Sequence, residues 1–452
     1  MTKSQVVLVE GGALDVDATS NAGDARWLAW RATIARLLRT PEARVAAVLC
    51  VCTAACTFRF TYAPGAPGLR QHFGAEYYGV ARALLDGRGF SDPFDEPTGP
   101  TAWVAPFYPV LIATLLAVFK SKSAAAWAVL FLTNLSIIFT GTTIYALVRR
   151  CSRVVPAWLC VPFFVAWTYA YSFWFYSLTG DIWLMMLLFT FMTIVIYRYI
   201  QLGEMKVWVW GLLGGLAALI SPTLALGWGC LLALFFFRAR GERRKWLMAA
   251  GIALLMGSPW ATRNAIQFGH FIPVKSNVPY ELFQSTVGDM DGLLDVQTFT
   301  QHPYVRLEER FLYAQVGEAE YLASKQVIFN RWMATHRIDY LKRLASRIYC
   351  ATLKYLPIAE GENQEGAIWL RRGIHPLPFL LLILSIWIRG PNQRLLKVFA
   401  LFYLVYAGSY LPIAYYVRYF MALTSILVLF VMLGADQILW RLRQPRVARP
   451  AS

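Results

Sequence analysis

The sequence predicts an all-α membrane protein with about ten transmembrane helices and two large external loops that contain short interfacial helices. Its 452 residues are 58% hydrophobic and only 15% charged, whereas soluble domains carry about 25% charged residues. Apolar runs at 124–147, 182–200 and 421–439 are long enough to cross a bilayer as helices. The net charge of +17 comes largely from basic residues that flank such runs. Basic residues in these places set topology and contact anionic lipids, so nucleic acid is not expected as a partner.

Residues 1–44 are predicted to form a cytoplasmic tail followed by an amphipathic helix. Residues 1–24 are rich in Gly, Ala, Ser and Asp and are expected to be disordered. At 26–39, arginines alternate with Trp and aliphatic residues, which is typical of a helix on an anionic membrane surface. The first span, at 45–62, follows this long basic region. We therefore expect it to be kept as an anchor and not cleaved as a signal peptide.

Four clusters of basic residues determine the predicted orientation. They lie at 149–153, 238–245, 389–397 and 441–449, and an excess of Lys and Arg marks cytoplasmic segments. One count of spans places all four clusters, and both ends of the chain, in the cytoplasm. It has ten spans, at 45–62, 124–148, 155–172, 181–200, 206–220, 222–238, 246–262, 374–389, 395–412 and 418–440.

The same count divides the chain into a module at 45–262, a second external loop at 263–373, the last helices at 374–440 and a basic tail at 441–452. The first external loop, at 63–123, includes the apolar run 106–119. A run of that length is too short for a span and favours a re-entrant or interfacial segment. The second loop is expected to contain helices at 321–343 and 344–356, the latter on the outer membrane surface. We find no tandem repeat.

A short helix in the first external loop carries the first candidate for chemistry. Gly87 is expected to end this helix. Glu76 lies on one face with Gly79 and Ala83, whose small side chains are expected to leave room for a ligand. A surface helix with a solvated Glu76 is the alternative. The apolar face has helical spacing and consists of Tyr77, Val80, Ala81, Leu84 and Leu85.

Other acidic residues lie close to this helix or at the mouth of a span. Asp92, Asp95 and Glu96 follow the helix in a loop. Asp181 precedes the apolar run at 182–200 and is expected on the external side. A carboxylate at a span end is often only an interfacial cap, so both interpretations of Asp181 remain open.

Two external passages carry basic and amide side chains. The passage at 258–277 contains Arg263, Asn264 and Asn277 just outside a span, and Arg418 and Tyr419 lie at the external start of the last span. An arginine in that place either reaches lipid phosphates from the interface or binds the phosphate of a lipid-linked substrate, because guanidinium fits phosphate oxygens.

No cofactor or metal site is predicted. Asp289 and Asp291 form a D-x-D pair, which can hold a divalent cation on a sugar phosphate. Two acids one residue apart are common by chance in a polar loop, so a divalent cation stays open. The five histidines are scattered and the seven cysteines lack metal-site spacing. The chain has no GxxxxGK[ST] or GxSxG pattern, which argues against P-loop ATP hydrolysis and the common hydrolase elbow.

The order of these features resembles the GT-C glycosyltransferases, in particular bacterial family 39 relatives of protein mannosyltransferases and of the lipid A aminoarabinose transferase. The resemblance touches both external loops and the last span, and the order of its pieces is more specific than any one of them. The pieces are AEYYGVARALLDGRGF at 75–90, GPTAWVAPFYP at 99–109, SPWATRNAIQFGHFIPVKSN at 258–277, GEAEY at 317–321 and YYVRY at 415–419.

The resemblance implies transfer of a sugar from a polyprenyl-phosphate donor to a lipid, glycan or protein at the external face of a bacterial inner membrane. It implies an inverting displacement with a carboxylate base. The family usually has an Asp-Glu pair at the start of the first external helix, where this chain has Gly74, Ala75 and Glu76, so Glu76 is the candidate base. Arg418 and Arg263 are the candidates to stabilise the leaving phosphate. The other substrate-binding candidates are Tyr77, Asp92, Asp181, Asn264, Asn277 and Tyr419.

Two other functions remain open from the sequence. One is a transporter or flippase of a lipid-linked sugar, and the other is a degenerate, non-catalytic scaffold, an alternative that the missing Asp-Glu pair leaves open. Transporters usually show internal repeats and ionisable residues near the bilayer midplane. Here charged residues within the spans are few and polarity concentrates in the two external loops, which favours an enzyme.

Overall fold

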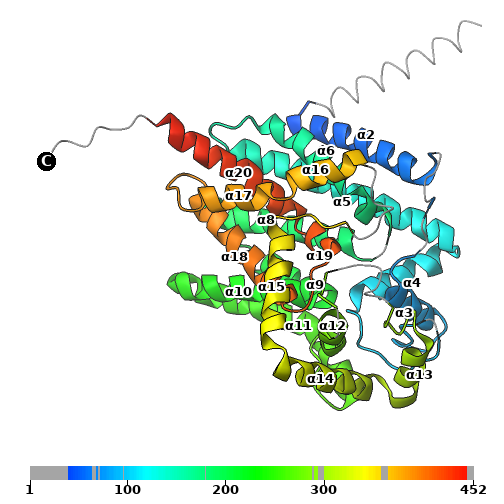
Figure 1. The fold of residues 1–452 in the computed structure, drawn as a ribbon. Helices are drawn as coiled ribbons and strands as arrows, with labels where there is room; N and C mark the ends of the chain where they lie inside the picture. Colours follow the sequence, from blue (N-terminus) through cyan, green and yellow to red (C-terminus); the bar gives the residue numbers. More distant parts are fainter. Residues whose placement is uncertain are drawn as a thin grey trace, which may run out of the picture.

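The computed structural model describes residues 39–63, 68–69, 72–94, 96–178, 180–287, 290–293, 300–357 and 365–444 (Figure 1). In these ranges the chain is helical, with two isolated β-bridges and no strand. The predicted all-α class is therefore confirmed. The expected N-terminal tail, most of the helix at 26–39 and the C-terminal tail beyond 444 lie outside the described residues.

Five helices are long and apolar enough to cross a membrane, which supports the prediction of an integral membrane protein. Helices α10 (Pro222–Arg238) and α11 (Arg243–Phe268) are bent by 111° relative to each other and would add a sixth span if they form one broken span. The five are α2 (Pro41–Thr61), α5 (Lys122–Cys151), α8 (Ile182–Leu202), the segment Ile368–Ser385 and α20 (Thr424–Arg443).

The remaining expected spans also coincide with helices, but these are shorter, bent or less apolar. Segment Ile368–Ser385 itself contains two helices, α16 (Glu365–Ile374) and α17 (Leu377–Ser385). The other helices are η1 (Ala157–Leu159) with α6 (Cys160–Ala170) and α7 (Ser172–Tyr176), α9 (Val207–Ile220), α18 (Gln393–Tyr410) and α19 (Val417–Met421).

Helices α9 and α11 pack at very short range because glycines line one face of α9. A β carbon on Gly211 would lie 2.5 Å from the Cβ of Ile252, and one on Gly215 would lie 2.6 Å from Met256. Small residues allow this approach between helices in membranes. The sequence GLLGG at 211–215 therefore fixes α11 beside α9, and with it the start of the segment at 263–373.

The two loop segments at 63–123 and 263–373, which the sequence predicts to be external, share a small core of their own. Helix α3 (Ala75–Leu85) and the segments that follow it contribute Val80, Phe94, Trp103 and Val104. Helices α12 (Val278–Thr286), α13 (Leu307–Val316) and α14 (Glu318–Thr335) contribute the rest. These helices gather at the lower right of Figure 1, together with α4 (Phe107–Phe119). The core joins the two external loops through the cluster Val80, Phe94, Trp103, Val104, Tyr280, Tyr313, Tyr321 and Leu322.

Two boundaries differ from the expected ones. The helix expected at 321–343 ends at Thr335, and α15 runs from Arg337 to Thr352 in place of a helix at 344–356. The break falls at His336, whose ring stacks on Trp332 with centroids 4.9 Å apart. Helix α4 has 13 residues and ends at Lys120, which has a left-handed φ of 50°, so it is about 20 Å long.

A buried carboxylate at the end of α20 holds a turn of the chain. Asp436 is fully buried, and its Oδ1 accepts hydrogen bonds from the Ser152 hydroxyl (2.7 Å) and the N–H groups of 153, 154 and 155 (2.6–3.0 Å). Its Oδ2 accepts from the Asn392 amide (3.2 Å). Buried donors that lose their acceptor cost about 1–3 kcal/mol each.

We therefore expect Asp436→Ala to lower the thermal unfolding midpoint by several degrees, and Asp436→Asn, which keeps one oxygen, to lower it less. Unfolding of the detergent-solubilised protein, followed by tryptophan fluorescence, measures both. The control is Asp339→Ala, because Asp339 is half exposed and 3.5 Å from Lys342; such pairs contribute little. An equal midpoint shift in the control would contradict the structural role of Asp436.

Candidate functional site

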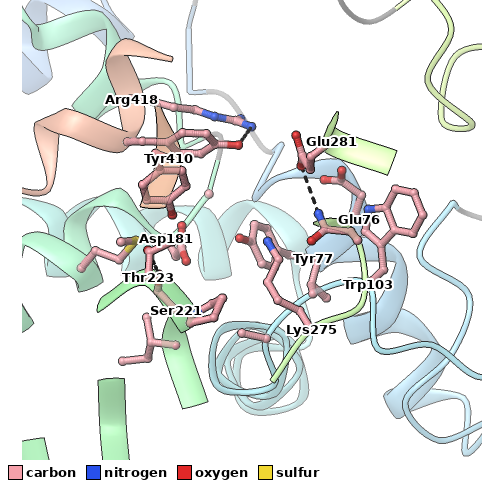
Figure 2. A pocket seen from close by; sticks show the side chains of 18 of the residues that line it. Glu76, Tyr77, Trp103, Asp181, Ser221, Thr223, Lys275, Glu281, Tyr410 and Arg418 are labelled. Carbon is pink, nitrogen blue, oxygen red and sulfur yellow. Dashed lines mark hydrogen bonds between the residues drawn. The ribbon is translucent and has the colours of Figure 1, made fainter. Parts of the chain in front are cut away.

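A pocket lies where α3 and α12 meet the ends of the longer helices (Figure 2). It contains about 1070 Å³ of empty space, including its open mouth. Its polar wall comes from α3, from the start of α8, from the junction of α9 and α10, from the segment leading into α12, and from 410–419. These side chains are Glu76, Tyr77, Asp181, Ser221, Thr223, Lys275, Asn277, Glu281, Tyr410, Arg418 and Tyr419.

Glu76 sits in the first turn of α3, where the helix dipole favours a negative charge. Its Oε1 lies 3.3 Å from Nε2 of His302, which is buried with 7% exposure. Nδ1 of His302 lies 3.1 Å from the backbone nitrogen of Tyr304 and accepts its N–H. The proton of the neutral imidazole therefore lies on Nε2 and points to Glu76.

The three carboxyl groups of the pocket have different pKa values. Burial raises the pKa of Glu76, but the hydrogen bond from His302 and the charge of Arg418 outweigh burial and lower this pKa to about 2. Burial raises the pKa values of Asp181 and Glu281, and Lys275 and Arg418 offset only part of this effect. Glu76 is thus ionised at neutral pH.

Two cations also belong to the pocket: Figure 2 shows Arg418 above and Lys275 below, between Asp181 on the left and Glu76 and Glu281 on the right. Arg418 donates from Nη2 to the Tyr419 hydroxyl at 3.3 Å, and its buried Nε has no hydrogen-bond partner among the described residues. Lys275 lies close enough to Asp181 and Glu281 to lower their pKa values, yet among the described residues its ammonium forms no ion pair with a carboxylate. Both cations can therefore receive an anionic group of a ligand.

The structure brings together six of the nine residues proposed from the sequence. Each of the six lines the pocket, although they come from four separate segments of the chain. They are Glu76, Tyr77, Asp181, Asn277, Arg418 and Tyr419. Asp92, Arg263 and Asn264 do not line it.

Asp92 instead closes its own loop. Its Oδ1 accepts the N–H groups of Thr98 (2.8 Å) and Gly99 (2.9 Å), and its Oδ2 bonds Ser91 and Arg88. This loop covers Gly79, where a β carbon would lie 2.7 Å from the Asp92 carbonyl oxygen. The expectation that Gly79 and Ala83 leave room for a ligand is therefore wrong, because the chain itself fills that space and both residues are buried.

Arg263 and Asn264 hold loops in place behind the pocket. Arg263 donates to the carbonyl oxygens of Thr101 (2.7 Å) and Phe90 (2.8 Å), and Asn264 donates to that of Ile272 (3.0 Å). These bonds tie the end of α11 to both external loops. The two residues support the wall next to Trp103 and contribute no side chain to the pocket lining.

Glu318, from the GEAEY piece, is a buried junction between the loops. Its carboxylate accepts from the Thr101 hydroxyl, the Ala102 N–H, the Ser276 hydroxyl and the Tyr313 hydroxyl at 2.5–2.8 Å. In the segment leading into α12, Ser276 bonds Glu318 while its neighbours Lys275 and Asn277 line the pocket.

Sequence reasoning missed Lys275, Glu281, His302, Ser221, Thr223 and Tyr410. Lys275 was detectable, because it alternates with Asn277 in a passage already singled out. His302 was not, because its contact with Glu76 joins two loops that are remote in sequence. Among the described residues no three His, Cys, Asp or Glu side chains form a group able to hold a metal ion, and Asp289 of the D-x-D pair lies outside them.

No protein-family model, curated protein or solved structure matches this chain.

Proposed function

We propose that the protein is a membrane glycosyltransferase that moves a sugar from a polyprenyl-phosphate donor to an acceptor at the external face. One observation carries the proposal: three carboxylates and two cations from both external loops and from helix ends line a single pocket. Phosphate departure needs a cation and the attacking hydroxyl needs a proton acceptor. The pocket offers both kinds of group.

In the proposed reaction the oxygen of the acceptor hydroxyl attacks the anomeric carbon of the sugar. The bond from this carbon to the phosphate oxygen breaks as the new bond forms, so the configuration inverts. Glu76 takes the hydroxyl proton, and the phosphate leaves as polyprenyl phosphate with its charge held by Arg418. The apolar helices beneath the pocket receive the polyprenyl tail.

Donor binding makes Glu76 a better base in this scheme. Arg418 lowers the pKa of Glu76, and a phosphate bound to Arg418 neutralises that charge. The pKa of Glu76 therefore rises from its low value when the donor binds. A base is most effective when its pKa lies nearer the working pH, so proton transfer is favoured once the donor is in place.

We also propose the arrangement in the membrane that the basic clusters predict: ten spans, both termini in the cytoplasm of a bacterial inner membrane, and α3, α4 and α12–α15 outside. Helix α4 supports this arrangement because its length of about 20 Å is less than the bilayer core of about 30 Å. The pocket then opens on the external side.

Cysteine labelling in spheroplasts tests this topology. In a variant without native cysteines, Ser123→Cys at the exposed start of α5 should react with a membrane-impermeant maleimide. Gly241→Cys, between α10 and α11, has no atom near its β carbon and should react only after permeabilisation. The opposite pattern would invert the topology and place the pocket on the cytoplasmic side.

The position of the polar groups that line the pocket argues against a transporter. Asp181 directly precedes α8, Ser221 precedes α10, and Tyr410 ends α18, so the pocket lies at helix ends. Binding sites in transporters usually lie near the bilayer midplane, between repeats or at broken helices.

A transfer assay decides between the candidate functions. Undecaprenyl-phosphate donors that carry different labelled sugars are reconstituted with the protein in liposomes, and a membrane lipid extract or cell-wall fraction is added as acceptor. We expect labelled acceptor and released undecaprenyl phosphate with at least one donor. Passage of intact donor across the bilayer would instead show a flippase, and binding of undecaprenyl phosphate with neither event would show a scaffold.

A further inference from the structure

His302 is held by contacts with residues from both loops, 63–123 and 263–373. Its ring meets three aromatic rings edge to face: Phe94 at 5.7 Å, Trp103 at 6.0 Å and Tyr280 at 5.4 Å, with interplanar angles of 83–86°. These rings belong to both external loops. Together with the Tyr304 N–H bonded to Nδ1, they fix both the plane and the tautomer of the imidazole.

We propose that His302 positions Glu76, holding Oε1 with its Nε2–H so that Oε2 faces the acceptor hydroxyl. His302 thus acts through Glu76 and does not itself exchange a proton with the substrate. The arrangement also couples the two external loops, because the acid comes from the first loop and its orienting group from the second. The catalytic meaning of this pair rests on the proposed glycosyltransferase function, whereas the pair itself can be tested without it.

The neutral tautomer explains why a histidine suits this position. A second proton on Nδ1 would point at the Tyr304 N–H, where two donors would face each other. In this geometry the imidazole donates to Glu76 through Nε2. The other ionisable groups that face Glu76 are Arg418, Glu281, Tyr77 and Tyr280. The two tyrosines are neutral donors, but Tyr280 donates its hydroxyl to the Gln301 carbonyl (3.1 Å) and Tyr77 is hydrogen-bonded to Asp181.

Two matched substitutions separate the contacts of the imidazole. His302→Asn places its amide near the position of Nδ1 and can still bond Tyr304, but it is too short to reach Glu76. His302→Gln is longer and can place an N–H near the position of Nε2. The proposal predicts a loss of function in the Asn variant and a substantial rescue in the Gln variant. If His302 had a purely structural role, the Gln variant would not be more active than the Asn variant.

The readout is the protonation of Glu76 itself. Dicyclohexylcarbodiimide modifies protonated carboxyl groups in apolar surroundings, and peptide mass spectrometry shows which residue is modified at each pH. Without the His302 hydrogen bond, burial still raises the pKa of Glu76, and fewer interactions remain to lower this pKa. Modification of Glu76 should therefore begin at a higher pH in His302→Asn than in the wild type, and near the wild-type pH in His302→Gln.

Asp181 is the internal control, because it lines the same pocket and its pKa does not depend on His302. Its modification profile should be the same in all three proteins, which also shows that the pocket is folded. A Glu76 profile that is unchanged in His302→Asn, with an unchanged Asp181 profile, would overturn the proposal. If the profiles shift as expected but no donor is turned over by the wild type, the pair stands and the transferase proposal fails.

In the transfer assay, His302→Asn should lower turnover by about 10-fold or more while leaving the affinity for undecaprenyl phosphate unchanged, because the phosphate binds elsewhere in the pocket. Loss of both turnover and undecaprenyl phosphate binding in a folded variant would assign His302 to the donor site and contradict a positioning role.

Discussion

Replacing Glu76 with glutamine is expected to slow sugar transfer by about 10²–10⁴-fold, the usual loss when a general base is removed. The substitution keeps the shape of the side chain, and the amide oxygen can still accept the Nε2–H of His302, 3.3 Å away in the wild type. The loss would therefore report proton acceptance and not a rearranged pocket. Binding of undecaprenyl phosphate, measured separately, should be largely kept.

The pH dependence gives a second measure of this role. The pKa of Glu76 is lowered to about 2 from its usual value of 4.5. The base is active when ionised, so wild-type turnover should persist well into the acid range and fall only as the pH approaches this pKa, shifted upward by the bound donor. If the residual activity of Glu76→Gln does not fall at low pH, the fall in wild-type turnover at low pH is caused by protonation of Glu76.

Glu281→Gln and Asp181→Asn are the matched controls, because both residues are carboxylates of the same pocket. Their pKa values are raised by burial, which makes either one an alternative proton acceptor. Near-normal turnover in Glu76→Gln, together with a collapse in one of these variants, would move the base to that residue. The pocket and the fold would be unaffected by that result.

The sequence predicts the class of fold well because hydrophobic length and charge placement act locally. The apolar runs appear as helices, and the glycines at 211, 214 and 215 allow the close packing of α9 and α11. The sequence predicts the number of transmembrane spans less directly. Helices such as α9, with 14 residues, are short, and a bend of 111° separates α10 from α11, features that depend on packing between helices.

The candidate site was predictable where a residue lies at a helix end inside a recognisable motif. Glu76, Asp181 and Arg418 each do so, and each lines the pocket. Arg263 and Asp92 have similar sequence surroundings but bond the backbone of their neighbours. Their different role depends on where the loops fold back, which composition and spacing do not record.

Arg418→Ala is expected to weaken binding of undecaprenyl phosphate by about 10–100-fold, because hydrogen bonds to charged groups contribute about 1.5–3 kcal/mol. Arg418 is well placed for this role: it stacks over Tyr416 and Tyr419, and its buried Nε lacks a partner among the described residues. Arg418→Lys keeps the charge but loses the planar two-pronged geometry, so we expect weaker binding there as well.

Binding of undecaprenol, which has no phosphate, distinguishes phosphate recognition from tail binding. The Arg418 variants should bind undecaprenol as the wild type does, since the guanidinium contributes nothing to an uncharged headgroup. Arg337→Ala is the control for general loss of positive charge, because Arg337 is exposed on α15 and does not line the pocket. If Arg418→Ala and Arg337→Ala both leave undecaprenyl phosphate affinity and turnover intact, then Arg418 only anchors the chain at the membrane interface. Lys275, the other cation of the pocket, would then be the cation that receives the phosphate.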